Sequence, residues 1–418
     1  MERVKEVSAF LEDNDVKFIR LAFTDIFGVL KNISVNAKEF EKICKYGAAI
    51  DASRFSGFMN IETTDLLLFP DLDTITILPW RPSTGRVVRF YCDVFYPDGK
   101  AFEGDSRSIL REANEECERH GFSASIASES EFYLFQSDLN GKPTQIPLDN
   151  ATFMDVAPLD AGENIRREIC LDLQQMGIYT KTSYHEKGPG QNAIIFSRAQ
   201  ALTAADNLVT YRNAVKSIAA INGLYASFMP KPLKDQPGSG LRIKISLQKN
   251  DRNIFNDEYD NKIQEQNQFI AGILNRIYDI SLLLNPISNS YLRIGQMNAP
   301  KYIMWSTTNK DLTLRINMED RIIIRSADNS CNPYLAYALI LKAGLAGVEN
   351  QEELKAVAKK HAKVLPANME EAIKAFKESE FVKANLPISI IDTYISEKLK
   401  EAKIKNHDYS DDDYFKLI

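Results

Sequence analysis

A strand-like stretch, SASIASESEFYLF, spans residues 123–135. Its alternation is that of a β-strand, in which residues i and i+2 lie on the same face of a sheet. Glu129 and Glu131 therefore share one face. Two adjacent carboxylates repel each other unless a metal ion, a cationic partner or a shifted pKa lets them coexist. Taken alone, the segment is also consistent with an ordinary solvated strand face.

A second strand-like stretch, GSGLRIKISL at residues 238–247, alternates with the opposite sign of charge. Its polar face and the turn before it supply Arg242, Lys244, Ser246, Gly238 and Ser239. The turn lacks the GxxxxGK[ST] spacing, so it gives only a weak indication of a phosphate-binding loop. Glu186 lies beside a Gly-Pro-Gly turn, and Arg325 ends the strand-like run RIIIR. If these faces meet, three carboxylates and three cations form one site.

Composition limits the classes of function. The chain has 418 residues and a formal net charge of −6, from 51 Lys plus Arg and 57 Asp plus Glu. This acid excess argues against a general nucleic-acid-binding protein, which needs a basic face. The sequence lacks an apolar run of the ~18 residues that a spanning helix needs, and its first residues lack a signal-peptide pattern. We therefore expect a cytoplasmic protein with no nucleic-acid or membrane partner.

The chain divides into two units. Residues 16–100 are rich in strand-like runs, and a long amphipathic helix then begins with Asp105 or Ser106 as its cap. We place the boundary there, so the predicted domains are residues 1–102 and 103–418. Strands and helices interleave in the second unit without a strict βαβ order, which predicts an α+β fold. A helix is expected over residues 263–284, and the charged region from Gln351 is expected to be helical through ISEKLKEAKIK.

Several segments, in their order and spacing, together resemble glutamine synthetase of the bacterial and archaeal type over nearly the whole chain. The early markers are FTDIFGVLKN, IDASRFSGF, DLLLFPDLDT and FYCDVFYPDGKAFEGDSR; the later ones are ESEFYLF, HEKGPGQN, FMPKP, GSGL, NSYLR, APKYIMWS and NPYLAYALILKAGLAG. The resemblance implies a small N-terminal β-grasp domain and a larger catalytic domain with a curved antiparallel sheet. It also implies a homo-oligomer, a hexameric ring or a dodecamer of two stacked rings, with active sites between neighbouring subunits.

The implied reaction joins glutamate and ammonia through a γ-glutamyl phosphate. It uses ATP and divalent ions such as Mg²⁺ as cofactors. The resemblance assigns metal-ligand positions to Glu129, Glu131 and Glu186, an ammonium-binding position to Asp51, glutamate-binding positions to Gly238 and Arg293, and positions serving the ATP phosphates and the transferred group to Arg315 and Arg325. These residues define an expected site for a small anionic substrate.

The sequence departs from the family pattern at positions that bind metal or substrate or take part in the reaction. They are Ala193 and Ile323 in place of metal-ligand glutamates, Arg242 in place of a metal-ligand histidine, Lys244 in place of a phosphate-contacting histidine, Asn298 in place of the catalytic flap glutamate, Pro237 in place of a glutamate-site asparagine, and Lys310 in place of a substrate arginine. The loop that can carry an adenylylated tyrosine is shortened or absent between Gln351 and Ala367. We predict that an arginine beside Glu129 replaces the ion's charge with a fixed guanidinium.

Three hypotheses follow from these departures. Asn298 cannot accept a proton from ammonium, so ordinary glutamine synthesis is not expected. The first hypothesis is a non-catalytic member, without Mg²⁺ or ATP as cofactors, that binds an anionic metabolite or assembles with a true glutamine synthetase. The second is an ATP-dependent carboxylate–amine ligase that uses one Mg²⁺ through the three glutamates while Arg242 and Lys244 clamp phosphates. The third, different chemistry on the same scaffold, has no positive sign in the sequence.

Overall fold

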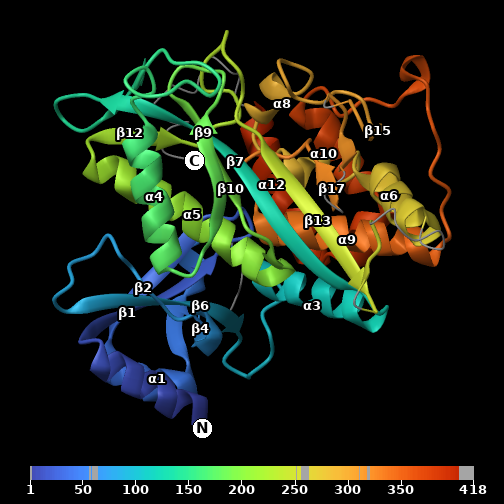
Figure 1. Cartoon of the computed structure of the whole chain (residues 1–418). Helices are drawn as coiled ribbons and strands as arrows, with labels where there is room; N and C mark the ends of the chain where they lie inside the picture. Colours follow the sequence, from blue (N-terminus) through green and yellow to red (C-terminus); the bar gives the residue numbers. More distant parts are fainter. Residues whose placement is uncertain are drawn as a thin grey trace.

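The computed structural model describes residues 2–55, 58, 65–250, 252–255, 263–309, 311–317 and 321–403. Two β-sheets of different size form its framework, and helices pack around the larger one (Figure 1). Lys310, which the sequence analysis placed at a substrate position, lies outside the described residues. So does the acidic carboxyl-terminal tail.

The smaller, N-terminal sheet has six strands in the path β2-β1-β6-β4-β3, with β5 paired to β6. The strands are β1 (Val16–Thr24), β2 (Leu30–Asn36), β3 (Ala48–Asp51), β4 (Asp65–Pro70), β5 (Thr76–Ile77) and β6 (Arg86–Phe95). Its helical elements are α1 (Glu2–Asp13), η1 (Ala37–Glu39), α2 (Phe40–Tyr46), η2 (Ala52–Arg54) and η3 (Leu72–Thr74). β1 and β6 run parallel, and α1 buries Val7 and Leu11 in the core of this unit.

The larger sheet has eleven strands in the path β15-β16-β17-β13-β7-β10-β9. The strands are β7 (Ser123–Ser137), β8 (Pro143–Pro147), β9 (Thr180–His185), β10 (Gln191–Phe196), β11 (Ala199–Gln200), β12 (Leu224–Ser227), β13 (Leu241–Lys249), β14 (Arg252–Asn253), β15 (Trp305–Ser306), β16 (Leu314–Asn317) and β17 (Arg321–Ile324). All pairs are antiparallel except β15 with β16. The long strand β7 is central, because β13 and β10 flank it.

Helices of the second unit surround this sheet (Figure 1). They are α3 (Ser106–Arg119), α4 (Glu163–Gln175), α5 (Ala201–Ile221), α6 (Ile263–Arg276), α7 (Ser281–Leu284), α8 (Ser290–Arg293), α9 (Pro333–Glu349), η4 (Lys359–His361), α10 (Met369–Glu378), α11 (Glu380–Asn385) and α12 (Ile388–Lys403). The expected cap of the first of these helices is confirmed, since the Asp105 side chain accepts the Arg107 N–H at 3.0 Å.

The two faces of the large sheet differ in what they contact. On one face of β7 the Ser128 hydroxyl lies 2.7 Å from that of Tyr337 on α9, and Phe132 packs edge-on against Tyr211 on α5. Helices therefore cover this face. Because side chains alternate along a strand, Glu129 must lie on the opposite, polar face of the sheet. The fold thus separates the apolar core from the charged residues.

Two helix predictions are wrong in part, although α10, α11 and α12 confirm helical structure in the charged region from Met369 onward. The run 263–284 is interrupted, because α6 ends at Arg276 and the next helix, α7, begins only at Ser281. After α9 the chain is extended up to Asn368, apart from the short turn η4. Glu352 is tied there to Arg276 by a 2.6 Å ion pair, and this tertiary contact overrides the helical preference of the charged segment.

Candidate active site

Arg242 and Glu129 lie directly opposite each other in the β7–β13 ladder. The Arg242 guanidinium contacts Glu129 through Nη1 and lies 2.9 Å from Glu131 Oε1 through Nη2. Lys244 Nζ lies 2.6 Å from the second oxygen of Glu129. Both oxygens of Glu129 are therefore ion-paired with side chains of the chain itself.

Glu186 completes a group of three buried carboxylates. Ligand oxygens of Glu129, Glu131 and Glu186 all lie within 4.8 Å of one another, and a group of this kind could hold a metal ion. Burial, followed by repulsion from Glu186, raises the pKa of Glu131 to about 8. The cluster therefore favours a nearby positive charge, and the guanidinium of Arg242 supplies it.

The donors around these carboxylates leave little coordination for a divalent ion. Glu131 accepts the Gly240 N–H at 2.7 Å on Oε2, in addition to Arg242 on Oε1. Glu129 is held by Arg242 and Lys244. A divalent ion placed here would meet two side-chain cations and carboxylate oxygens that are already engaged. In this arrangement, the residues do not fit a two-metal centre.

Further cations and apolar side chains lie beside the carboxylates. Ile323 is opposite Lys244 on β17, and Ala193 is opposite Glu131 on β10, so neither position offers a ligand atom. Burial and the guanidinium groups of Arg321 and Arg242 lower the pKa of Lys244 to about 7, while its contact with Glu129 opposes that shift. The polar face thus carries arginine and lysine side chains beside its three glutamates.

A small cavity adjoins the ion pairs. Its volume is ≈ 20 Å³, room for about one water molecule, and Glu131, Glu186, Arg293 and Arg325 line it. Asn298 closes one side, since its carbonyl oxygen accepts from Arg325 Nη2 at 3.2 Å. The Nε atoms of the two lining arginines are buried and have no hydrogen-bond partner among the described residues.

Gly238 allows the chain to approach Arg293 closely. A Cβ atom at this glycine would lie 2.4 Å from the Pro230 carbonyl oxygen and 2.6 Å from Arg293 Cγ, so only glycine fits. Arg293 is fixed from the other side, where its Nη2 donates to the carbonyl oxygens of Ser326 and Ala327 at 2.6 and 3.0 Å. The Gly238 turn and Arg293 therefore form one rigid wall of the cavity.

The remaining candidates lie at different distances from this cavity. Ser239 is fully buried beside it, and Ser246 is buried on the same face of β13 as Lys244. Arg315 is half-buried on β16, opposite Ile323. Asp51 is separate: it is exposed at the end of β3 in the N-terminal sheet, and its carboxylate is bonded to Ser53 and Arg54. Within one chain, the structure does not bring Asp51 to the cavity.

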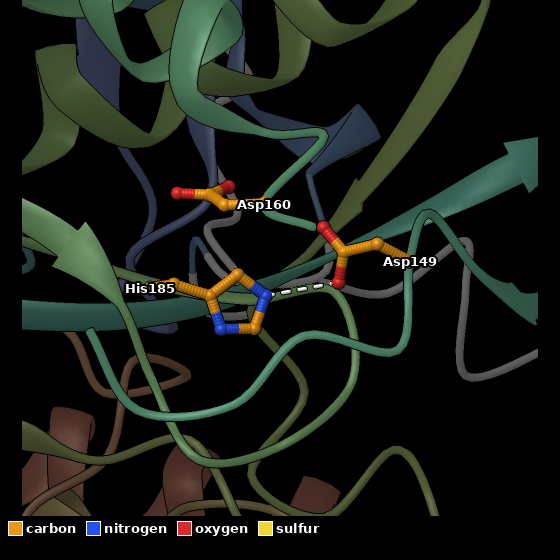
Figure 2. A group of neighbouring side chains, drawn as sticks. All are labelled: Asp149, Asp160 and His185. Atoms are coloured by element: carbon orange, nitrogen blue, oxygen red, sulfur yellow. Dashed lines mark hydrogen bonds and ion pairs between the residues drawn. The ribbon is translucent and has the colours of Figure 1, made fainter. Parts of the chain in front are cut away.

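Sequence reasoning missed a second group, formed by Asp149, Asp160 and His185. Figure 2 shows the His185 ring pointing toward Asp149, with 2.9 Å between Nε2 and Oδ1. His185 Nδ1 lies 2.7 Å from the Glu186 carbonyl oxygen. Both ring nitrogens thus meet acceptors. Burial lowers the pKa of His185, but these two partners outweigh it and raise the pKa overall.

This second group positions Glu186 rather than offering ligands. Asp160 is held by the guanidinium of Arg166, and Asp149 also accepts the Gly190 N–H at 2.8 Å. The carboxylates are therefore occupied, and the pair of Asp149 with His185 fixes the backbone that carries Glu186. The one signal in the sequence was the histidine next to a candidate glutamate.

Two family models match this architecture and site: the glutamine synthetase β-grasp domain over residues 15–97 and the glutamine synthetase catalytic domain over residues 103–415. They confirm the expected β-grasp unit and α+β catalytic fold. The chain belongs to the glutamine synthetase family.

Relatives and solved structures agree. The chain is 40% identical to a glutamine synthetase of Clostridium saccharobutylicum, covering 98% of both chains, and 40% identical to one of Methanosarcina mazei, covering 95% of this chain and 93% of that one. A structure described as "GmaS/ADP complex-Conformation 1" superposes with a TM-score of 0.86 at 25% identity, over 94% of this chain and 95% of that one. A Plasmodium falciparum glutamine synthetase shares the fold, with a TM-score of 0.87 at 21% identity over 98% of each chain.

Across the described residues, no helix combines the length and the apolar character that crossing a membrane requires.

Proposed function

We propose that this chain is a catalytically altered member of the glutamine synthetase family that binds an anionic metabolite without a divalent metal. The observation that carries the proposal is the ion pairing of Glu129, whose two oxygens contact Arg242 and Lys244. A guanidinium that is part of the chain neutralises the carboxylates as a bound metal ion would, but it cannot dissociate and exchange with solvent. The carboxylates then cannot present phosphates to a metal, and the cations become the anion-binding groups.

The chemistry of the flap supports the same proposal. Asn298 lines the cavity, and an amide cannot take a proton from ammonium, so the step that produces the ammonia nucleophile has no base there. The arginines of the cavity remain. Arg293 and Arg325 both line the cavity, and guanidinium groups suit a carboxylate or phosphate group. Anion binding is therefore retained where catalytic machinery is reduced.

We also propose that the chain works as a homo-oligomer, a hexameric ring or a dodecamer, or that it assembles with a true glutamine synthetase. Asp51 supports this, because it is exposed on an edge strand of the N-terminal sheet and would reach a cavity only on a neighbouring subunit. In the same scheme residues 1–102 and 103–418 act as the two domains, and the location is the cytoplasm.

The test is a calorimetric titration of the purified protein with Mg-ATP, followed by a phosphate-release assay with glutamate and a panel of amines. The proposal predicts no release of phosphate above the rate without protein, and no heat of Mg²⁺ binding. Phosphate release that depends on Mg²⁺, glutamate and an amine would contradict it.

A gain-of-function variant provides the matched control. Arg242→His, Ile323→Glu, Ala193→Glu and Asn298→Glu together restore the residue types that the family pattern has at these positions. We expect Mg²⁺ binding to appear in this quadruple variant, because the cation on Glu129 is gone and carboxylate ligands are added. If no Mg²⁺ binds, the assignment of these four positions is wrong.

One observation favours a second candidate function, an ATP-dependent carboxylate–amine ligase with one Mg²⁺. Glu186 has no ion pair of its own among the described contacts and faces the same cavity as Arg325. A nucleotide ligand is compatible with the structural relative whose description includes ADP. In the assay above, this function requires both Mg-ATP binding and amine-dependent phosphate release.

A further inference from the structure

A large cavity lies away from the carboxylate cluster, on the outer side of helix α6. Its volume is ≈ 640 Å³, which is within the ~300–1,000 Å³ of small-molecule sites. Its walls are α6, the start of β15 and residues 352–363, which we call the strap. The strap is the extended segment that replaces the expected helix after Gln351, and the proposed function leaves it without a role. Figure 1 shows this part of the chain on the outside of the molecule, beyond α6.

The strap is anchored at both ends, so the cavity is part of the fold. At one end Glu352 bonds to Asn275 and Arg276, both at 2.6 Å. At the other, the Lys363 carbonyl oxygen accepts the Ile303 N–H at 2.8 Å. Between these anchors the indole N–H of Trp305 lies 3.4 Å from the Lys355 carbonyl oxygen. The strap therefore spans the cavity with its backbone held in place.

The floor of this cavity is apolar and only partly covered. Leu274, Ile303, Trp305 and Leu354 line it and pack against the main core while remaining partly exposed. Val357 on the strap is 42% exposed. A ligand with an aromatic or aliphatic body would remove these surfaces from water, and the indole ring offers it a flat contact.

The rim of the cavity carries two lysines, Lys355 and Lys363, and the Lys363 ammonium also lies 3.9 Å from the centre of the Tyr278 ring. Lys355, His361 and Lys363 line it, while the carboxylate of Glu352 is already bonded to Arg276 and Asn275. Glu353 is the other carboxylate in the lining. A ligand with an anionic group at one end would place that group at the rim and its apolar body on the floor.

We propose that the cavity under the strap binds a small amphipathic anion, with an apolar ring system over Trp305 and a carboxylate or sulfonate against Lys355 and Lys363. The site is independent of the carboxylate cluster, so it stands whether or not the proposed function of that cluster is correct.

The experiment uses anilinonaphthalene sulfonate, an apolar ring system with one sulfonate, as the probe. The chain has two tryptophans, Trp80 and Trp305, so Trp80→Phe leaves the cavity residue as the one tryptophan, which is excited selectively at wavelengths that tyrosine does not absorb. The proposal predicts saturable quenching of Trp305 emission as the probe is added, by energy transfer over a short distance. In Trp305→Phe, the emission of Trp80 should stay nearly unchanged at the same probe concentrations. Emission from Trp305 that does not respond to saturating probe would overturn the proposal.

Charge is tested in the Trp80→Phe background with two matched pairs of lysines. Lys355→Glu with Lys363→Glu reverses the charge of the rim and should weaken probe binding about tenfold. Lys359→Glu with Lys360→Glu makes the same change of charge on strap residues that do not line the cavity, and should leave binding within about twofold. The uncharged analogue N-phenylnaphthylamine should bind more weakly than the sulfonate. Equal weakening by both pairs, or equal binding of the uncharged analogue, would contradict the rim assignment.

Discussion

Arg107 is buried and Arg242 is half-buried, and both contact carboxylates, but their partners come from different parts of the chain. Arg107, on α3, contacts Asp71 at 2.7 Å, Asp93 at 2.9 Å and Asp206 at 3.0 Å. The first two aspartates belong to the N-terminal sheet region and the third to α5. This arginine therefore joins three elements that no common backbone ladder connects.

Arg242 instead contacts residues of the adjacent strand. β13 and β7 are already hydrogen-bonded along the register that pairs Leu241 with Ser130 through to Gln248 with Ser123. The ion pairs of Arg242 are not needed to hold these strands together. Their main effect is to neutralise Glu129 and Glu131, which would otherwise repel each other.

The two networks also differ in the donors that remain. The Nε, Nη1 and Nη2 atoms of Arg107 each have an aspartate acceptor. Beside Arg242, by contrast, Arg293 and Arg325 keep buried Nε atoms without a partner in the described part of the chain. The Arg107 network fills all of its donors with aspartates, while the arginines beside Arg242 line a cavity. That difference is what the following changes are designed to test.

The largest effect is expected for Arg107→Leu. It leaves Asp71 and Asp206 without this cation and Asp93 with Arg111 alone, so the free energy of unfolding should fall by ~3–5 kcal/mol, measured by urea denaturation. Arg111→Leu is the control, because Arg111 also contacts Asp93, at 2.7 Å, but has a 32% exposed side chain. The unfolding free energy of Arg111→Leu should fall by less than about 1 kcal/mol. If both variants lose a similar unfolding free energy, Arg107 does not hold the three elements together.

Arg242→Leu should cost less, ~2–3 kcal/mol, because Lys244 still pairs with Glu129 and the strand ladder remains. Unlike the Arg107 variant, it should regain stability when Mg²⁺ is added, since the freed carboxylates can then bind an ion. Lys249→Leu, on the same strand but paired with Glu265, is the control and should not respond to Mg²⁺. Denaturation with Mg²⁺ or with EDTA measures all three variants. If Mg²⁺ also raises the unfolding free energy of Arg107→Leu, the two networks do not differ in their ability to bind an ion.

Gly238→Ala tests the wall of the cavity. The new methyl group would meet the Pro230 carbonyl oxygen and Arg293, so we expect a loss of ~1–3 kcal/mol in unfolding free energy. Ser239→Ala is the neighbouring control, because the buried Ser239 hydroxyl has no hydrogen-bond partner among the described residues, and its removal should be nearly neutral. Thermal denaturation compares the two. If Gly238→Ala leaves the unfolding free energy unchanged, the Gly238 turn and Arg293 do not form a rigid wall.

The smallest effect concerns pH and the Asp149–His185 pair. The pKa of His185 is raised, so its contribution is complete below the unfolded pKa of 6.5 and is lost as pH rises through the folded value. Burial raises the pKa of Asp149, but His185 and the Gly190 N–H outweigh it and lower that pKa overall, so its contribution is lost as pH falls through a value under 3.8. Stability from this pair should therefore be greatest between these limits.

The variant His185→Gln isolates this pH effect. The stability difference between wild type and variant should shrink as pH rises above 6.5, in denaturation curves recorded across the range. The Arg107 network should show no such change over the same range, because arginine stays protonated. A difference that is constant with pH would contradict the pairing.

Strand patterns and the family resemblance predicted much of the site, for local reasons. Alternation along β7 and β13 separates charged from apolar faces, and that signal needs only neighbouring residues. The Arg107 joint could not be predicted in this way, because Asp206 lies 99 residues away from Arg107 in the sequence. The pairing of His185 with Asp149, 36 residues apart, was missed for the same reason.

The two wrong helices have a related cause. The run that includes α6 and α7 keeps its apolar character across the break, and Leu282 and Leu284 are fully buried, so periodicity alone did not reveal a turn. The strap has helix-forming residues, but its contacts to Arg276 and Trp305 hold it extended. Tertiary contacts decided both cases.

The central claim is that the cations of the chain replace the metal at Glu129. The most direct measurement is the midpoint of urea unfolding of the wild-type protein in excess Mg²⁺ and in EDTA, at constant ionic strength. The account predicts the same midpoint in both, because an ion cannot compete with Arg242 and Lys244 for Glu129. A midpoint that rises with Mg²⁺ concentration and saturates would show a metal bound to the folded state, and would contradict the account.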